Sequence, residues 1–359
     1  ALARELGGRP KFADRWRGWL TDHPDAVFFG GLAAVTLGLV ALAVGLAALA
    51  GGAGWVLLLV AAAVVLPASD LAVGVVNFLV CRLLPPRVLP KLDFKDGIPP
   101  EFRTVVVIPG MLTKPESAAA LCERLELHHL ANPDPQFRFA LLTDWADAAT
   151  ETTPKDDELV RVAVEGVRRL NERYAAGGPD RFFLLHRRRL FNPAEGAWMG
   201  WERKRGKLDE FNRLLLGATD TSYAVQTGNP AAVGAKFVLT LDADTVLPRD
   251  AGRRLVATLA HPLNRPVLSA DGRRVVAGYG LLQPRVSFLY RTGLRSWFAR
   301  VFAGSAGIDP YSSATSDVYQ DLWGWGTFTG KGLYDVEAFH ATAGSAFPEN
   351  AILSHDLLE

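Results

Sequence analysis

Residues 236–245 read Lys-Phe-Val-Leu-Thr-Leu-Asp-Ala-Asp-Thr, and they indicate the fold class more clearly than any other segment of the chain. The mainly apolar run over residues 236–241 is typical of a strand that is buried on both faces of a parallel sheet. Asp242 and Asp244 follow directly, and the period of two along a strand predicts that both carboxylates lie on the same side. Such a pair can share a hard cation such as Mg²⁺ or Mn²⁺. The alternative is a solvated turn at the end of the strand, and the apolar run before the pair favours the functional interpretation.

Similar strands occur earlier in the chain and alternate with helical patterns. Strands are predicted over residues 104–108, 137–142 and 181–186, and a helix is predicted over residues 155–174, where apolar residues recur at helical spacing. This alternation predicts an α/β fold with a mostly parallel sheet and helices on both faces. Ligands bind such sheets at the carboxyl ends of the strands. There the chain places Asp144, the arginines of 187–189 and the Asp242–Asp244 pair.

The N-terminal part has a different composition. No charged residue occurs from 26 to 50, and a second apolar run from 55 to 81 follows the turn sequence Gly-Gly-Ala-Gly. About 20 apolar residues are enough to cross a bilayer as a helix, so two transmembrane helices are expected. Basic residues flank both ends, which places both ends in the cytosol. A cleaved signal peptide fits less well, because the apolar stretch is too long and no cleavage site follows.

These patterns predict a division of the chain into four parts. We expect a cytosolic segment at 1–25, two transmembrane helices within 26–82, a proline-rich linker at 83–100 and a catalytic domain over 101–359 that is truncated at its C-terminus. The chain begins with Ala1 rather than Met, and we interpret it as a piece of a longer protein. Its 39 basic and 38 acidic residues argue against a nucleic-acid-binding protein. Two cysteines make a disulfide framework unexpected.

Three further motifs suggest chemistry. Lys204-Arg-Gly-Lys207 precedes an amphipathic helix, and cations at the start of a helix attract phosphate; a solvated basic turn is the alternative. The glycine-rich segment 320–332 contains Trp323 and Trp325, whose flat faces suit sugar rings, although a buried aromatic cluster is as good an interpretation. Asp356 follows Ser-His, and a carboxylate beside a sugar hydroxyl can act as a general base.

In this order the motifs resemble the inverting, processive type-A glycosyltransferases, the class that includes cellulose synthase. The closer resemblance is to the glycosyltransferase region of bacterial cyclic β-1,2-glucan synthases. It rests on residues 186–208, the Leu-Asp-Ala-Asp-Thr segment, the Trp-Gly-Trp-Gly-Thr-Phe-Thr-Gly-Lys-Gly segment and residues 353–359. It covers roughly residue 96 to the end. It implies the type-A fold and a hexosyltransferase that builds a β-1,2-glucan, later cyclised, from UDP-glucose.

The resemblance also implies a role for individual residues. Asp144 would contact the uridine, Lys204 and Lys207 would contact the donor, and Asp242 and Asp244 would bind the diphosphate and a Mg²⁺ or Mn²⁺ ion. Asp356 would be the catalytic base, with His355 where many relatives have Glu. The growing glucan of such enzymes is thought to be tethered to the protein, and Tyr311 or Tyr319 is our candidate for the primer, with Tyr311 slightly favoured.

The resemblance further implies partners and a location. Besides the UDP-glucose donor and the glucan acceptor, we expect the lipid bilayer and a C-terminal phosphorylase-like domain of the same protein, and no nucleic acid. The location would be the bacterial inner membrane, with several membrane spans and a cytosolic catalytic domain. Two alternatives stay open: a related membrane enzyme that makes a β-1,4 or β-1,3 glucan, and a membrane-anchored, non-catalytic sugar-binding module.

Overall fold

The computed structural model describes residues 12–84, 88–175, 178–284, 296–297, 318–324, 328, 330–344, 346 and 348, with the side chains of 13, 14 and 320 left out. These residues divide into two compact units. Three residues with a predicted role, Asp356, Tyr311 and Trp325, lie outside the described residues.

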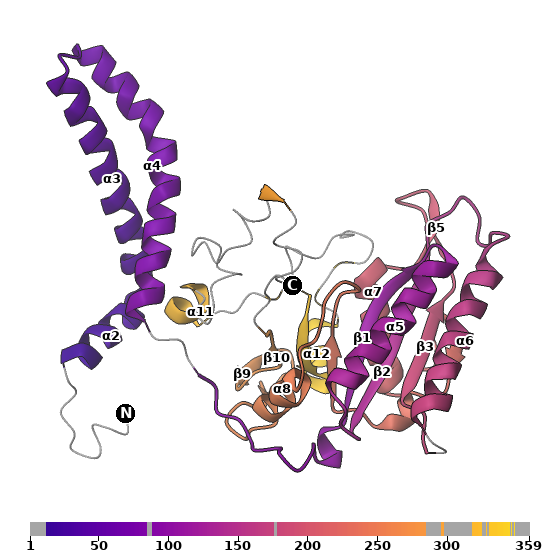
Figure 1. The fold of residues 1–359 in the computed structure, drawn as a ribbon. Helices are drawn as coiled ribbons and strands as arrows, with labels where there is room; N and C mark the ends of the chain where they lie inside the picture. The colour runs from indigo at the N-terminus through magenta and orange to yellow at the C-terminus, as the bar shows by residue number, and fades with distance from the viewer. Residues whose placement is uncertain are drawn as a thin grey trace. The chain divides into compact units, whose positions relative to one another are not determined.

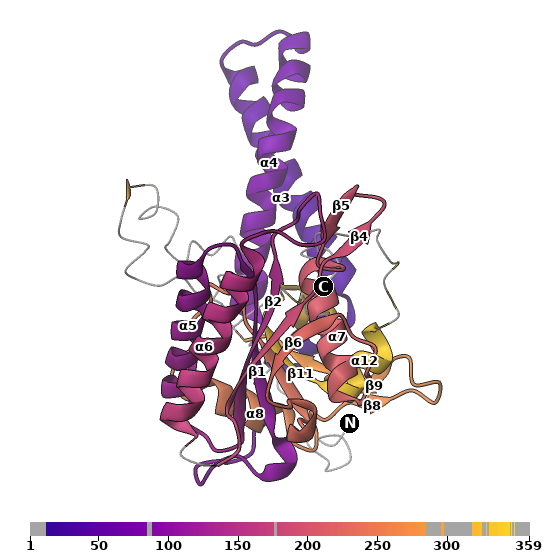
Figure 2. The same cartoon turned by 90° about the vertical axis from the view of Figure 1, so that its right-hand side faces the viewer.

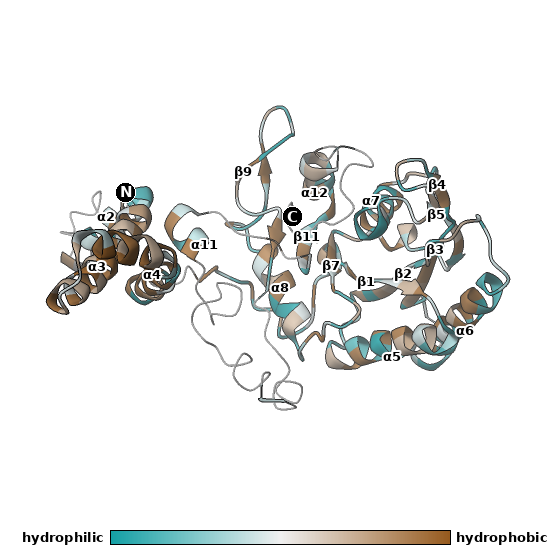
Figure 3. Ribbon diagram, turned by 90° about the horizontal axis from the view of Figure 1, so that it is seen from above, coloured by the Kyte–Doolittle hydropathy of each residue, from teal (hydrophilic) through white to brown (hydrophobic). Residues whose placement is uncertain are grey.

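The N-terminal unit contains the expected helical hairpin. After the short helix α2 (Phe12–Asp22), helices α3 (Pro24–Leu49) and α4 (Gly54–Leu83) run antiparallel, side by side, and the turn between them is made by residues 50–53 (Figures 1 and 2). Both long helices are mainly apolar (Figure 3). With 26 and 30 residues they are long and apolar enough to cross a membrane, since a helix of about 20 residues spans the hydrocarbon core.

The N-terminal unit also includes a segment from much later in the sequence. Helix α11 (Val318–Trp323) places Val318 and Leu322 in an apolar cluster with Phe28 of α3 and Val76 of α4. The prediction that 101–359 forms one domain was therefore wrong for this segment. A helix of six residues buries too little apolar surface to be stable by itself. Its position therefore depends on apolar contacts with residues far away in the sequence, which no local pattern shows.

The second unit is an α/β domain. The described residues form a sheet of seven strands in the order β10-β11-β7-β1-β2-β3-β6. Strands β7, β1, β2 and β3 are parallel, and the flanking strands β11 and β6 run antiparallel to them, which confirms the mostly parallel sheet. The bounds are β1 (Thr104–Leu112), β2 (Phe137–Trp145), β3 (Phe182–Arg187), β6 (Tyr223–Thr227), β7 (Phe237–Thr240), β10 (Leu281–Leu282) and β11 (Gly332–Asp335).

Helices cover both faces of this sheet, as expected. Helices α5 (Pro115–Ala131), α6 (Asp156–Tyr174) and α8 (Ala251–Leu259) lie on one face, and α7 (Arg203–Leu215) and α12 (Val336–Ala343) lie on the other (Figure 3). Consecutive residues of β1 contribute to different cores: Val106 and Ile108 pack under α5 and α6, and Val105 and Val107 pack under α7. Side chains alternate along a strand, so a strand covered on both faces is apolar throughout.

The boundary of the α/β unit lies earlier than predicted. The expected linker at 83–100 contributes buried Phe94 and Ile98 to the core. The ring of Phe94 stacks on Phe102, and Phe102 stacks on Phe237 of β7, with ring centroids 5.8 and 6.0 Å apart. The unit begins at Leu89. The prolines of this segment suggested a linker, but its aromatic side chains supply the apolar area that binds it to the core.

The strands differ from the predictions mainly at their ends. Strand β1 continues through Pro109 and Gly110 instead of ending there. Its pairing with β7 stops at Val107, while its pairing with β2 continues to Leu112, so the missing N–H of Pro109 breaks no bond to β7. The flanking strands β6, β10 and β11 and the two hairpins β4 (Leu190–Asn192)–β5 (Ala197–Met199) and β8 (Val267–Leu268)–β9 (Val275–Ala277) were not predicted. These strands are too short to show the alternation of apolar and polar residues that predicts a strand.

Candidate functional site

The predicted donor-binding residues gather around the carboxyl ends of neighbouring strands and the start of one helix. Asp242 follows β7, Gly110 lies near the end of β1, and Asp144 lies near the end of β2. Because β1 lies between β7 and β2, the two aspartates flank the end of β1. Helix α7 begins beside them with Lys204 and Lys207, which are one helical turn apart and so lie on neighbouring positions of its surface.

Asp144 is held by two buried cations. Its carboxylate accepts from Arg187 Nε at 2.7 Å and from Arg187 Nη2 at 2.9 Å, and Lys207 Nζ lies 3.0 Å from its Oδ2. Lys207 Nζ also donates to the carbonyl oxygen of Gly110 at 2.7 Å. Burial by itself would raise the pKa of Asp144, but the Lys207 and Arg187 charges hold that pKa below its usual range. Asp144 is therefore an anion whose main contacts are already made within the protein.

Arg187 connects this ion pair to the start of α7. Its guanidinium is fully buried and uses all of its N–H groups: besides Asp144 it binds Glu210 Oε2 at 3.1 Å and the carbonyl oxygens of Trp201 and Arg203 at 2.8 and 2.9 Å. Between those carbonyls the backbone is strained, because Glu202 and Arg203 have φ of 50° and 47°. Arg187 thus holds the turn from which Lys204 and Lys207 extend.

Sequence analysis placed Arg187 at a strand end but assigned it no role. Its importance follows from contacts with residues 14 to 43 positions away. Gly200 completes this arrangement, since a Cβ there would lie 2.4 Å from Asp144 Oδ2 and 2.9 Å from Arg187 Nη2. A signal was present in the cluster of arginines at the end of β3, but nothing local distinguished Arg187 from its neighbours.

Asp242 is held between two lysines. Lys204 Nζ lies 2.7 Å from its Oδ1 and Lys331 Nζ lies 2.7 Å from its Oδ2. Lys204 also donates to the carbonyl oxygen of Gly330 at 3.0 Å. Burial would raise the pKa of Asp242, but the two ammonium groups hold it below its usual range.

The second carboxylate of the pair has a different environment. Strand β7 ends at Thr240, and the backbone N–H of Thr245 bonds to the carbonyl oxygen of Asp242 at 3.0 Å in a turn. The period of two that was used to predict a shared side therefore does not apply, because residues 242–245 are not extended. Asp244 is exposed on this turn, while Asp242 is partly buried.

A test of the expected metal site follows from these contacts. No three His, Cys, Asp or Glu side chains are grouped for a metal ion in the described part of the chain. Mg²⁺ commonly takes only one or two carboxylates from the protein and further oxygens from substrate phosphates. In this structure both carboxylate oxygens of Asp242 are paired with ammonium groups, so a metal site at Asp242 and Asp244 stays a prediction.

A cavity of about 220 Å³ opens beside the strand ends. Three of the four residues that were predicted to bind the donor line it, namely Asp144, Lys204 and Lys207, whereas Asp242 does not. Gly110, Trp145 and Gly200 are also part of the lining. Ligand pockets commonly measure about 300–1,000 Å³, so this cavity is smaller than most of them.

His186, next to Arg187, is buried and neutral. Its Nδ1 lies 2.8 Å from the hydroxyl oxygen of Thr143, and its ring meets the edge of Trp145 with centroids 4.2 Å apart. Burial lowers the pKa of His186 to about 4. His186 thereby supports Trp145, which lines the cavity.

Acidification is expected to weaken the folded state through His186. The unfolded chain binds a proton near the ordinary histidine pKa of about 6.5, whereas the folded chain binds it only near 4. The free energy of unfolding should therefore fall as pH decreases through this window, by roughly 2 kcal/mol for this group between pH 7 and pH 5. In His186→Gln the decrease in melting temperature between pH 7 and pH 5 should be smaller than in the wild type, and an equal decrease would contradict this assignment.

Two further residues with a predicted role belong to the N-terminal unit. Tyr319 and Trp323 are both on α11, where their rings stack with centroids 5.8 Å apart, and Trp323 Nε1 donates to Asp25 Oδ1 at 2.8 Å. Trp323 also packs edge-on against Phe28. The proposed roles of Trp323 in glucan binding and of Tyr319 as primer stay predictions, as do those of the three residues outside the described part.

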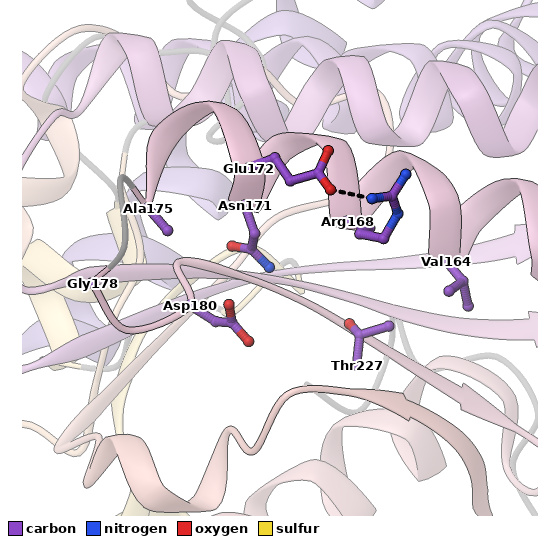
Figure 4. Close-up of a pocket in the computed structure, with 8 residues that line it drawn as sticks. All are labelled: Val164, Arg168, Asn171, Glu172, Ala175, Gly178, Asp180 and Thr227. Carbon is purple, nitrogen blue, oxygen red and sulfur yellow. Dashed lines mark hydrogen bonds and ion pairs between the residues drawn. The ribbon is translucent and has the colours of Figure 1, made fainter.

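A second cavity, of about 450 Å³, lies between α6 and β6 (Figure 4). The ion pair of Arg168 with Glu172 lines it. Asn171 also lines it, and the Asn171 side chain forms hydrogen bonds with the backbone of Phe182. Asp180 on its rim precedes β3, so the cavity lies toward the amino end of this strand. None of the predicted site residues lines it.

Comparison with known proteins supports the resemblance that the motifs suggested. No family model matches the chain. A curated protein, the cyclic beta-(1,2)-glucan synthase NdvB of Rhizobium meliloti (strain 1021), is 50% identical over 309 residues. The chain is homologous to a segment of NdvB. The match covers 86% of this chain and 11% of NdvB, so the chain corresponds to a small part of that synthase. The predicted similarity to cyclic β-1,2-glucan synthases is thereby confirmed.

Proposed function

We propose that this chain is part of a membrane glucosyltransferase that uses UDP-glucose to build a β-1,2-glucan by an inverting, processive reaction. The observation that carries the proposal is the cluster of Lys204, Lys207 and Asp144 around one cavity at the strand ends, in a chain homologous to part of a glucan synthase. Carboxyl ends of parallel strands are where α/β folds bind ligands, and lysines beside a helix start suit phosphate.

The donor would be bound by side chains that the protein already holds in place. Lys204 and Lys207 each have three N–H donors. Protein acceptors take two of them in each residue: Asp242 and Gly330 for Lys204, and Asp144 and Gly110 for Lys207. One N–H donor of each ammonium group would therefore be available to a donor phosphate when it first binds. Asp144 would orient Lys207 and contact the uridine at the cavity wall.

A divalent Mg²⁺ or Mn²⁺ ion, when bound, would neutralise charge on the diphosphate leaving group. Asp242 and Asp244 are the residues that would hold it. The acceptor hydroxyl would attack the anomeric carbon of glucose from the side opposite to the diphosphate. The new glycosidic bond forms as the bond to UDP breaks, and Asp356 would accept the hydroxyl proton.

The membrane arrangement is part of the same proposal. Helices α3 and α4 would cross the inner membrane as a hairpin, with both ends in the cytosol because basic residues flank both. The α/β unit follows α4 directly, so it would lie in the cytosol, where UDP-glucose is made. The bilayer, the growing glucan and a phosphorylase-like domain of the same protein would be its partners.

Incorporation of labelled glucose tests the proposal. Membranes that contain the full-length protein should convert UDP-glucose to a β-1,2-linked product when Mg²⁺ or Mn²⁺ is present. The Asp244→Asn variant should lose most of this activity, because it removes an exposed carboxylate from the proposed cation site. Asp93→Asn is the control, since Asp93 is also exposed and pairs with Lys95 on the surface.

Each other outcome has a distinct meaning. A product with β-1,4 or β-1,3 linkages would refute the linkage but retain the reaction class. Binding of glucan without metal, together with no binding of UDP, would indicate the sugar-binding module instead. Full activity of Asp244→Asn would remove this residue from the site.

A further inference from the structure

Lys331 has no role in the function proposed so far, yet it contacts the same carboxylate as Lys204. The two Nζ atoms lie at equal distances of 2.7 Å from the two oxygens of Asp242. All three side chains are partly buried, with 22% to 29% of their surface exposed. One carboxylate is thus enclosed by two cations at the carboxyl end of β7.

The backbone, rather than a flexible loop, places Lys331 there. Strand β11 pairs antiparallel to β7 with Gly332 opposite Thr240, so Lys331 comes directly before the paired segment and beside the residues that follow β7. Gly332 has to be glycine, since a Cβ would lie 2.5 Å from the carbonyl oxygen of Leu282 on β10. The position of this lysine is therefore determined by the sheet.

We propose that Lys331 is a diphosphate-binding residue of the donor site, and that Asp242 holds Lys204 and Lys331 in position until a nucleoside diphosphate takes them over. This inference rests on the proposed function. In the donor-free protein both ammonium groups bind Asp242. In the donor complex they bind phosphate oxygens, and Asp242 becomes available to a divalent cation.

Charge balance supports this exchange. Lys204, Lys331, Asp242 and Asp244 together carry no net charge, so they do not attract a dianion by themselves. A divalent cation at the aspartates would make the cluster positive and complementary to the two ionised phosphates. Ammonium groups form strong, charge-assisted hydrogen bonds with carboxylates and phosphates alike, so either partner can hold the lysines.

The exchange predicts effects of opposite sign in Lys331→Gln. The affinity of the full-length protein for UDP in the presence of Mn²⁺ should fall about 10- to 100-fold, because a hydrogen bond between charged groups is lost. The affinity for Mn²⁺ without nucleotide should rise several-fold, because one cation no longer competes for Asp242. Equilibrium dialysis measures the first, and the electron paramagnetic resonance signal of free Mn²⁺ measures the second.

Two further variants make the result specific. Lys95→Gln removes an exposed lysine that pairs with exposed Asp93 and should change neither affinity. Lys331→Arg keeps the charge and should retain most of the UDP affinity, so it separates loss of charge from loss of structure. The inference is wrong if Lys331→Gln binds UDP like the wild type, or if UDP and Mn²⁺ affinities fall together. A wild-type protein that fails to bind UDP with Mn²⁺ would instead refute the proposed function, and this inference with it.

Discussion

Replacing Arg187 by methionine is expected to lower the free energy of unfolding by about 3–5 kcal/mol, because the change leaves buried charges without their partner. Asp144 and Glu210 are both buried, and each would lose its contact with the guanidinium. The strained turn at Glu202 and Arg203 would also lose the two hydrogen bonds that hold its carbonyl groups.

Thermal unfolding of the detergent-solubilised protein measures this effect. A decrease in melting temperature of roughly 10 °C is expected for a domain of this size. Arg168→Met is the matched control: Arg168 is exposed and forms surface ion pairs with Glu165 and Glu172, and such pairs contribute about 0–1 kcal/mol. Equal melting temperatures of the two variants would show that the Arg187 network does not stabilise the fold.

Replacing Asp356 by asparagine is expected to lower the rate of glucose incorporation about 10²- to 10⁴-fold, the usual contribution of a positioned general base. Asparagine has nearly the same shape as aspartate but cannot accept the proton of the acceptor hydroxyl. Donor binding does not need this proton transfer, so the affinity for UDP with Mn²⁺ should stay unchanged.

A lower rate with unchanged UDP affinity would distinguish the role of Asp356 from that of the donor-binding residues. Initial rates from labelled UDP-glucose and UDP affinity should be measured on the same full-length protein. Asp244→Asn should lose both, whereas Asp356→Asn should lose only the rate. Glu337→Gln removes an exposed carboxylate that pairs with Lys236 and should change neither. A rate in Asp356→Asn close to the wild type would show that another group is the base.

Some residues of the candidate site could be predicted from the sequence and others could not, for a physical reason. The sequence alone indicated Asp144, Lys204, Lys207 and Asp242, because strands and helix starts expose their end residues in a regular way. It placed Arg187 at a strand end and Lys331 within the glycine-rich segment, but it gave neither a role, because their contacts join segments far apart in the chain. It also assumed strand geometry for Asp242 and Asp244, although β7 ends at Thr240 before both.

For the fold, local patterns were sufficient wherever a segment is long and periodic. The apolar helices α3 and α4 and the buried strands β1, β2, β3 and β7 follow from composition, since each buries its surface in a way that its own residues specify. Only the tertiary structure decided the order of the strands, the antiparallel strands β6 and β11 at the flanks, the packing of α11 beside α3 and α4, and the pairing of Asp242 with two lysines. These features depend on which surfaces and charges from distant segments meet. The free energy of those contacts cannot be read from any single segment.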